Sequence, residues 1–478
     1  MKPIIGRERE LSQLRKLNES SRSEFVAVYG RRRIGKTFLI KQFFGGQYDF
    51  QVTGIFNAGL RQQILNFYAA LNRHAKGGIS EPVPETWFAA FQLLIQHLER
   101  LPEGRKVVFI DELPWMDTPK SGFVSALEHF WNSWAYHRDD ILLIVCGSAT
   151  TWMIDALINN YGGLHNRVTA RIPLHPFNLY ETDAFLKSKG GAFEPYQILE
   201  LYMALGGVPF YLEEVDISKS IPQNIDALFF SESGILRSEF DNLYRSLFKK
   251  HERHEAIIEA LSQKGIGLNR EDIAKLTGIS NGGTLTTLLK ELEQCEFIRK
   301  YQPFGSQKRG ALFQLTDPYS LFYLKFIKNT KAIGPGVWLS LVDQPSWRSW
   351  SGYAFENVCL LHLNQIKQHL GISGVYTEAG AWRSKKSDPA VQIDLLLDRR
   401  DRVINICEMK FAIAPYSITK SEAEKFRYKL LTLKSESQTA KGLFMTFISP
   451  FGLMQNQYSG VVHQVITHEA LFRPTFSP

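Results

Sequence analysis

Apolar runs that suit β-strands alternate with longer amphipathic stretches over the first 180 residues of the chain. Three of these runs, at 25–29, 107–110 and 141–146, are apolar at nearly every position. Strands of a parallel sheet have this composition because helices cover both of their faces. The pattern therefore predicts an α/β domain with a helix-wrapped parallel sheet over residues 1–180.

Beyond residue 180 the strand-like runs stop and the apolar residues recur at helical spacing. We expect residues 181–248 to form a small helical lid. Three short helical patterns and two β-rich runs follow, which is the order of a winged helix-turn-helix at 249–330. Glycine, proline and a Trp/Ser-rich stretch then break the periodicity at 330–350 and predict a linker. A second α/β unit is expected over 350–478.

The composition narrows the class of protein. Of the 478 residues 44% are apolar and 22% are charged, which is the balance of a folded protein. The four cysteines are scattered singly, without the close pairs of a zinc site or the density of a disulfide framework. Neither a signal-peptide core nor an apolar run of membrane-spanning length is found. We therefore expect a cytoplasmic protein without a membrane partner.

The net charge of +8 is unevenly distributed along the chain. Residues 1–248 hold 26 Lys and Arg against 27 Asp and Glu. Residues 249–330 hold 13 basic residues against 9 acidic ones, and residues 331–478 hold 17 basic residues against 12 acidic ones. A basic excess in this half favours a polyanionic partner such as DNA, and a solvated basic surface is the equal alternative.

The sequence GRRRIGKT at 30–37 follows the first predicted strand and precedes a helix. Its glycines let backbone N–H groups turn toward phosphates, and the helix N-terminus adds the positive end of its dipole. Lys36 is expected to hold the β- and γ-phosphates of ATP. The hydroxyl of Thr37 is expected to bind Mg²⁺, which prefers hard oxygen ligands. The residues predicted to line the nucleotide here are Gly30, Arg33, Ile34, Gly35, Lys36, Thr37 and Phe38.

Two acidic residues, Asp111 and Glu112, follow the second predicted strand. They stand at its carboxyl end, the edge at which parallel sheets bind ligands. Asp111 is expected to support Mg²⁺ through its water shell, and Glu112 to orient and polarise the attacking water. At the end of the third strand, Ser148 is a candidate to contact the γ-phosphate or that water. A plain strand-ending turn is the equal alternative for Ser148.

Two arginines, Arg167 and Arg171, precede the apolar segment 172–174. Either could act as an arginine finger on the γ-phosphate, in cis or from a second copy of the chain in a homo-oligomer. An exposed arginine without a catalytic role is the more common case.

Several segments together resemble one family. Over about residues 3–240 the chain is similar to the archaeal-type predicted ATPases of the AAA+/STAND class. The segments that carry this similarity are IIGRERE at 4–10, GRRRIGKT, IDELPWM, the strand end GSAT, RIPLHPF and GGVPFYL. The resemblance implies a P-loop NTPase that uses ATP and Mg²⁺, with Ile5, Gly6 and Arg7 near the adenine and a lid controlled by the nucleotide. The family often has Tyr-Gly-Arg before RIPL, where this chain has YGGLHNR at 161–167. The finger therefore stays open between Arg167 and Arg171.

The predicted winged helix carries few basic residues where DNA would be read. Asn269 is expected to cap a helix at 271–276, and a second helix at 282–294 occupies the recognition position with Lys290 as its one basic residue. Contacts with DNA phosphates normally need more than one basic residue. The expected wing contains more basic residues, namely Arg299, Lys300, Lys308 and Arg309. The sequence is therefore compatible both with a module that contacts DNA and with a module that only packs against other domains.

Charged residues also interrupt apolar runs near the C-terminus. Glu356 stands in a predicted helix and Asp394 in a strand at 391–397. In the next strand, Glu408 and Lys410 are two residues apart and therefore share a face. Such groups amid apolar runs are costly unless a cation or substrate compensates them.

This second pattern resembles the PD-(D/E)XK nuclease superfamily over about residues 350–470, with a restriction-endonuclease-like α/β fold. By that likeness Glu356, Asp394 and Glu408 would bind Mg²⁺, and Lys410 would orient water or stabilise charge at a scissile phosphate. The residue before the aspartate is Ile393, and the proline of the motif is only loosely matched. A domain that keeps the shape without the activity is the alternative.

Two hypotheses follow. In the first, an ATP-hydrolysing domain controls a DNA-acting, metal-dependent nuclease through the winged helix. In the second, the chain is an ATP-dependent switch or scaffold whose inactive nuclease-like domain binds a partner.

Overall fold

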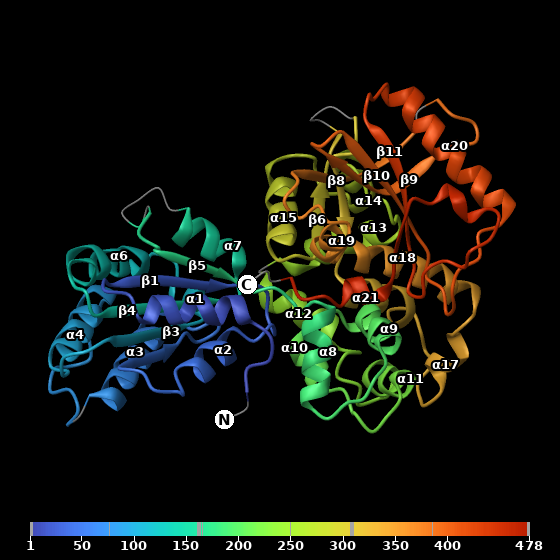
Figure 1. Ribbon diagram of the computed structural model, residues 1–478. Coiled ribbons are helices and arrows are strands. Elements are labelled where there is room, and N and C mark those ends of the chain that lie inside the picture. Colours follow the sequence, from blue (N-terminus) through green and yellow to red (C-terminus); the bar gives the residue numbers. More distant parts are fainter. Residues whose placement is uncertain are drawn as a thin grey trace. The chain divides into compact units, whose positions relative to one another are not determined.

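The computed structural model describes residues 3–75, 77–159, 164, 166–248, 250–305, 310–384 and 386–475. The chain divides into two compact units, Met1–His175 and Pro176–Pro478, which are described separately (Figure 1). In the described part of the chain, no helix is both long and apolar enough to cross a membrane.

The first unit is built on a five-stranded parallel sheet, so the α/β fold predicted for this part of the chain is confirmed. Its spatial order is β2-β3-β4-β1-β5. The strands at 25–29, 107–110 and 141–146 were predicted, and the two edge strands were not. The strands are β1 (Glu24–Tyr29), β2 (Phe50–Thr53), β3 (Lys106–Asp111), β4 (Ile141–Gly147) and β5 (Ala170–Pro173).

Helices cover both faces of this sheet (Figure 1). Alternate residues of β1 belong to different cores: Val26 and Val28 pack beneath α1 (Glu8–Asn18) and α2 (Lys36–Phe43). On the opposite face Phe25 and Ala27 belong to the core shared with three other helices. These are α3 (Leu60–His74), α4 (Trp87–Glu99) and α6 (Phe123–Ser133). Burial on both faces explains why the three central strands are uniformly apolar.

The second unit begins with helices. The region predicted to be a helical lid contains helices and no strand among its described residues. The helices are α8 (Leu179–Ser188), α9 (Pro195–Leu205), α10 (Pro209–Glu213), α11 (Ile221–Ile225) and α12 (Glu239–Leu247). Their apolar side chains belong to one continuous core with the elements that follow.

Three helices and an antiparallel pair of strands come next. They are α13 (His251–Ser262), α14 (Arg270–Thr277), α15 (Gly283–Gln294), β6 (Ile298–Tyr301) and β7 (Leu312–Leu315). The side chain of Asn269 accepts a hydrogen bond from the backbone N–H of Asp272, at 2.8 Å, and so caps α14 as predicted.

The linker predicted at 330–350 is wrong in its second half, because α18 (Pro345–Leu361) begins there. Trp347 and Trp350 are buried in the core of the unit, so the aromatic residues that broke the periodicity serve packing. A short helix, α17 (Val337–Leu341), precedes α18. The carboxylate of Asp226 fixes its start by accepting hydrogen bonds from the N–H groups of Gly336 and Trp338, both at 2.8 Å.

A mixed five-stranded sheet follows, in the order β12-β11-β10-β9-β8. β8 to β10 are antiparallel neighbours, whereas β10, β11 and β12 are parallel. α18 lies in the core on one face, and α20 (Lys420–Ser437) covers the other (Figure 1). The strands are β8 (Thr377–Arg383), β9 (Gln392–Arg399), β10 (Val403–Met409), β11 (Gly442–Ile448) and β12 (Gln464–Ile466).

Candidate functional site

The loop between β1 and α2 depends on its glycines. Gly30 has a φ of 144°, and a Cβ atom there would lie 2.2 Å from the carbonyl oxygen of Leu174 and 2.6 Å from Cδ1 of Ile34. Gly35, with a φ of 89°, stands immediately before α2. A larger residue at position 30 would displace the backbone of the loop. The sequence therefore folds here into a tight cradle at the N-terminus of α2, as an anion site requires.

Lys36 lies in this cradle. Its ammonium group donates hydrogen bonds to the carbonyl oxygens of Gly30, at 2.8 Å, and Arg31, at 2.9 Å. The residue is 5% exposed, so its positive charge is concentrated within the loop. A phosphate in the cradle would meet this charge together with the backbone N–H groups of the helix start.

The next residue along α2, Thr37, contacts the end of β3. Its hydroxyl donates a hydrogen bond of 2.8 Å to Oδ2 of Asp111. Burial raises the pKa of the Asp111 carboxyl, and the nearby Glu112 adds to this, while the hydrogen bond from Thr37 opposes it. A hydroxyl and a carboxylate side by side are hard oxygen donors, so the residues present fit Mg²⁺.

Glu112 is in the left-handed backbone region, with a φ of 47°, directly after β3. Its carboxylate accepts hydrogen bonds from the hydroxyl of Ser148, at 2.5 Å, and from the N–H of Ser148, at 3.1 Å. The two residues that the sequence assigned to the attacking water therefore bind each other. A non-glycine residue in this conformation is strained, which is common at functional sites.

The other residues predicted to line the nucleotide differ in exposure. Ile34 is buried, Arg33 is half-buried with a φ of 71°, and Phe38 is 41% exposed. Arg7, which the family resemblance placed near the adenine, is buried against the loop. Its guanidinium donates to the carbonyl oxygens of Ile34, at 3.2 Å, and His175, at 2.7 Å. Arg7 thus ties the N-terminal turn to both the loop and the end of the first unit.

The two candidate fingers lie at different places in the first unit. Arg167 precedes β5, and its guanidinium stacks 4.7 Å from the ring centre of Tyr136, which precedes β4. Both therefore lie at the amino end of the parallel strands, opposite the edge that carries Lys36. Arg171 is exposed within edge strand β5, opposite Ala27 of β1. A finger role for either remains a prediction.

The second predicted site lies in the mixed sheet. The antiparallel ladder of β10 and β9 has Cys407 and Leu395 as its last pair. Glu408 follows Cys407 on β10, and Asp394 precedes Leu395 on β9, so the two carboxylates come from neighbouring positions on adjacent strands. Nε2 of Gln392 donates a hydrogen bond of 2.5 Å to Oδ1 of Asp394. The fold thus places two of the three predicted metal ligands on adjacent strands.

Glu408 is paired with two lysines. Nζ of Lys410 lies 2.9 Å from its Oε1, and Nζ of Lys429, on α20, lies 2.7 Å from its Oε2. Burial would raise the pKa of Glu408, but Lys429 and Lys410 outweigh it and hold that pKa below the usual value. The pairing with Lys429 was not predicted, because the two residues are 21 positions apart and meet only through the fold.

Glu356 comes from α18, on the other face of the sheet from α20. Burial, with smaller contributions from Asp394 and Glu408, raises the pKa of its carboxyl to about 8. Among the residues that the structure describes, no three His, Cys, Asp or Glu side chains are grouped closely enough to hold a metal ion. The donor chemistry fits Mg²⁺, and the arrangement would have to tighten to hold it.

The strands β6 and β7 and the segment after β6 contact the rest of the second unit. Arg299 donates to Oε1 of Gln314 at 2.7 Å and stacks on the ring of Tyr301 at 4.6 Å. The N–H of Phe304 donates to the carbonyl oxygen of Ala381, on edge strand β8, at 2.8 Å. The first two contacts lie within the β6–β7 pair, and the third joins the segment after β6 to β8. Lys308 and Arg309, also predicted for the wing, lie outside the described residues.

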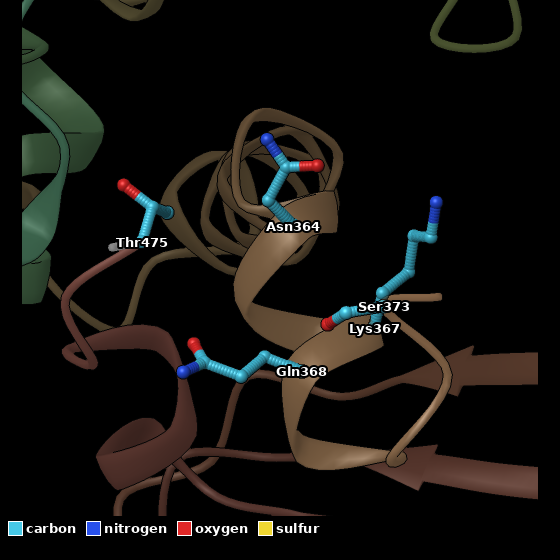
Figure 2. A pocket seen from close by; sticks show the side chains of 5 residues that line it. All are labelled: Asn364, Lys367, Gln368, Ser373 and Thr475. Carbon is cyan, nitrogen blue, oxygen red and sulfur yellow. The ribbon is translucent and has the colours of Figure 1, made fainter. Parts of the chain in front are cut away.

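A polar cavity of about 210 Å³ lies beside α19 (Leu363–His369) and contains none of the predicted residues (Figure 2). Three side chains of α19 and two from later segments surround it. The lining residues are Asn364, Lys367, Gln368, Ser373 and Thr475.

Comparison with known proteins identifies the first part of the chain. Residues 4–215 match the family described as an ATPase domain predominantly from Archaea. An uncharacterized protein of Methanocaldococcus jannaschii, MJECL04, is 24% identical over 423 residues, which are 85% of this chain and 87% of that protein. The chain therefore contains an archaeal-type ATPase domain.

Two solved structures resemble the chain at lower sequence identity. The Walker-type ATPase PABY2304 of Pyrococcus abyssi matches 67% of this chain and 96% of its own, with 17% identity and a TM-score of 0.48. The ORC2 protein of Aeropyrum pernix matches 68% and 94%, with 16% identity and a TM-score of 0.38.

Proposed function

We propose that this chain binds and hydrolyses ATP at the loop of residues 30–37. The observation that carries the proposal is the hydrogen bond between Thr37 and Asp111, which joins the phosphate cradle to the acidic end of β3. In this proposal Lys36 holds the β- and γ-phosphates, and Thr37 and Asp111 hold Mg²⁺. When bound, Mg²⁺ would neutralise developing charge on the phosphate oxygens.

Glu112 is the proposed base that orients the attacking water. In the structure its carboxylate is held by Ser148, so it must leave both hydrogen bonds before it can act on a water molecule. Ser148 would thereby keep the site inactive until the nucleotide is in position. Such gating is a common way to couple hydrolysis to a conformational step.

The test is a comparison of three variants. Lys36→Ala should lose ATP binding, because no backbone N–H group replaces the mobile charge of the lysine. Glu112→Gln should bind ATP and fail to hydrolyse it. Arg32→Ala, an exposed residue of the same loop, is the matched control and should behave like the wild type. Equal rates of phosphate release in the wild type, Lys36→Ala and Glu112→Gln would refute the assignment.

We propose a second activity, metal-dependent cleavage of DNA, for the cluster of Glu356, Asp394, Glu408 and Lys410. It is supported by the position of Asp394 and Glu408 on adjacent strands with Lys410 on the same face as Glu408. The carboxylates would hold a divalent cation against a phosphate, and Lys410 would stabilise the negative charge that develops there.

The region of α13 to β7 would be a winged helix that couples the two activities by packing. Two hydrogen bonds attach it to α18, the helix that carries Glu356. The side-chain amide of Asn357 donates to the carbonyl oxygen of Thr316 at 2.6 Å. The hydroxyl of Tyr353 donates to the carbonyl oxygen of Leu315 at 3.2 Å. A displacement of β7 would therefore move α18. DNA binding by the strands themselves is less well supported, because Arg299 is engaged within the unit.

Cleavage is tested with linear and plasmid DNA in Mg²⁺ or Mn²⁺, with and without ATP. Asp394→Ala and Lys410→Ala should each remove cutting and leave ATP hydrolysis intact. Asp401→Ala, an exposed carboxylate beyond the end of β9, is the control. If neither DNA nor RNA is cut under any of these conditions, the alternative of an ATP-dependent switch or scaffold with an inactive partner-binding domain replaces this proposal.

A further inference from the structure

The carboxylate of Glu408 has two oxygen atoms, and each is paired with a different lysine. Lys410 follows two residues later and pairs with Oε1 at 2.9 Å. Lys429 reaches from α20 and pairs with Oε2 at 2.7 Å. The carboxylate is 12% exposed, so solvent competes only weakly with the two ammonium groups. Both oxygens of a proposed metal ligand are thus already engaged by charges of the same chain.

Two ammonium groups, those of Lys410 and Lys429, stand beside the single carboxylate of Glu408. A divalent cation is attracted by uncompensated carboxylates, whereas an ammonium group beside its ligand both repels it and occupies a lone pair. The cation therefore competes with the two lysines for Glu408, and it binds more tightly once one of them has moved away.

We propose that Lys429 is an internal competitor of the metal at Glu408, and that a divalent cation binds the cluster only when Lys429 leaves Oε2. This inference rests on the metal site of the proposed function. In this proposal Lys429 is the lysine that leaves, because it reaches Glu408 from another element, α20. Lys410 stays, because it follows Glu408 by two residues in the chain and its ammonium group acts at the phosphate in the proposed function.

A polyanion would favour the same exchange. Lys429 lies one turn of α20 after Lys425, which is exposed and shares its side of the helix. A DNA phosphate bound at this helix would offer Lys429 another anionic partner. Metal loading would then follow DNA binding, and a chain without DNA would hold little metal at this site.

Titration calorimetry of the full chain with Mn²⁺, without nucleotide, tests the competition. Lys429→Met should bind Mn²⁺ about tenfold more tightly than the wild type or better, since one neighbouring charge is removed. Lys429→Gln should behave in the same way. Lys429→Arg keeps the charge and should resemble the wild type, as should Lys425→Met, the matched lysine one turn earlier that does not contact Glu408. Glu408→Gln should abolish binding.

The outcomes separate the inference from the proposed function. If the wild type and Lys429→Met bind equally and Glu408→Gln does not bind, the competitor role is refuted and the metal site stands. An equally large gain in Mn²⁺ affinity in Lys425→Met also refutes the competitor role, because the gain would then come from the lower positive charge of the whole region and not from Lys429 itself. If no variant binds Mn²⁺, the metal site itself fails, and the inference with it.

A second measurement tests the link to DNA. Titration with Ca²⁺, which takes similar ligands but activates water poorly, avoids cleavage. Duplex DNA should tighten Ca²⁺ binding to the wild type, and the gain should be smaller in Lys429→Met, in which the competitor is already absent. An equal gain in both proteins would refute the exchange of Lys429 between Glu408 and DNA.

Discussion

Ser148 and Glu112 face each other at the carboxyl edge of the parallel sheet, and in the proposed mechanism their contact sets the resting state of the site. Glu112 accepts two hydrogen bonds from one residue, and its backbone is in the left-handed region. Hydrogen bonds to a charged group contribute about 1.5–3 kcal/mol each. In the proposed mechanism, releasing Glu112 therefore has a free-energy cost that ATP binding must supply.

Replacing Ser148 by Ala should raise the basal rate of ATP hydrolysis by about tenfold to a hundredfold, because the stronger of the two hydrogen bonds is removed. The measurement is steady-state phosphate release at saturating ATP. Ser133→Ala, which removes an exposed hydroxyl on α6, is the control. A lower rate in Ser148→Ala would instead favour direct contact of Ser148 with the γ-phosphate or the water, the role first predicted from the sequence.

His362 predicts a dependence of stability on pH. Nε2 accepts a hydrogen bond from the N–H of Leu179 at 2.9 Å, and Nδ1 donates to the carbonyl oxygen of Val358 at 2.8 Å, so the ring is neutral. Burial lowers its pKa to about 4, against 6.5 in the unfolded chain. The unfolded state therefore binds the proton more readily. This stabilisation is complete above pH 6.5 and is lost as the pH falls toward 4, by about 3 kcal/mol in total.

Replacing His362 by Gln should lower the thermal midpoint at pH 7.5, since a buried pair of hydrogen bonds is disturbed. The difference from the wild type should shrink as the pH is lowered to 4.5, because only the wild type loses this stabilisation. His369→Gln, on the exposed side of α19, is the control. A constant difference across this range would show that His362 does not titrate as its burial implies.

At the scale of single elements, the sequence predicted what is contiguous and strongly patterned. The loop at 30–37 and the pair Asp111 and Glu112 are local signals, since each directly follows an apolar strand. Edge strand β2 was missed because it has four residues, of which Thr53 is exposed. The start of α18 was missed because Trp347 and Trp350 belong to a core that no local pattern reveals.

The candidate sites show the same division. Glu408 and Lys410 could be paired from their spacing along one strand, and Gln392 has the same spacing to Asp394 and could have been paired with it. Lys429 could not, because its position depends on how α20 packs. Likewise, the sequence left Arg167 and Arg171 equivalent. Strand order shows that Arg167 lies at the amino end of β5, away from the loop of its own chain.

The proposed DNA binding is predicted to use α20 rather than the strands β6 and β7. Lys425 and Arg427 are exposed on α20, while Arg299 on β6 is bonded to Gln314. Replacing both Lys425 and Arg427 by Ala should weaken DNA binding and reduce the slope of log affinity against log salt by about 2, with roughly 0.9 per phosphate contact. Arg299→Met should leave the slope unchanged. Fluorescence anisotropy at several salt concentrations measures both, and a slope changed only by Arg299→Met would contradict the prediction.

At the scale of the whole molecule, the phosphate loop is connected directly to the segment that leaves the first unit. A Cβ at Gly30 would lie 2.2 Å from the carbonyl oxygen of Leu174, so the loop backbone and this segment are in close contact. Arg7 bridges the carbonyl oxygens of Ile34 and His175, the last residue of the unit. A change in the loop on nucleotide binding would therefore act on Leu174 and His175, the last two residues of the first unit.

This connection predicts that Arg7 links nucleotide state to DNA cleavage. Arg7→Met should keep ATP hydrolysis within about tenfold of the wild type, a loss of no more than about 1.4 kcal/mol in transition-state stabilisation. It should also abolish the difference between cleavage with and without ATP, because the loop no longer holds residue 175. Cleavage and phosphate release are measured on the same preparations, with Arg9→Met, an exposed arginine of α1, as the control. If Arg7→Met retains the wild-type response to ATP, the coupling runs through other contacts. If the wild type itself cuts DNA equally with and without ATP, the two activities are independent.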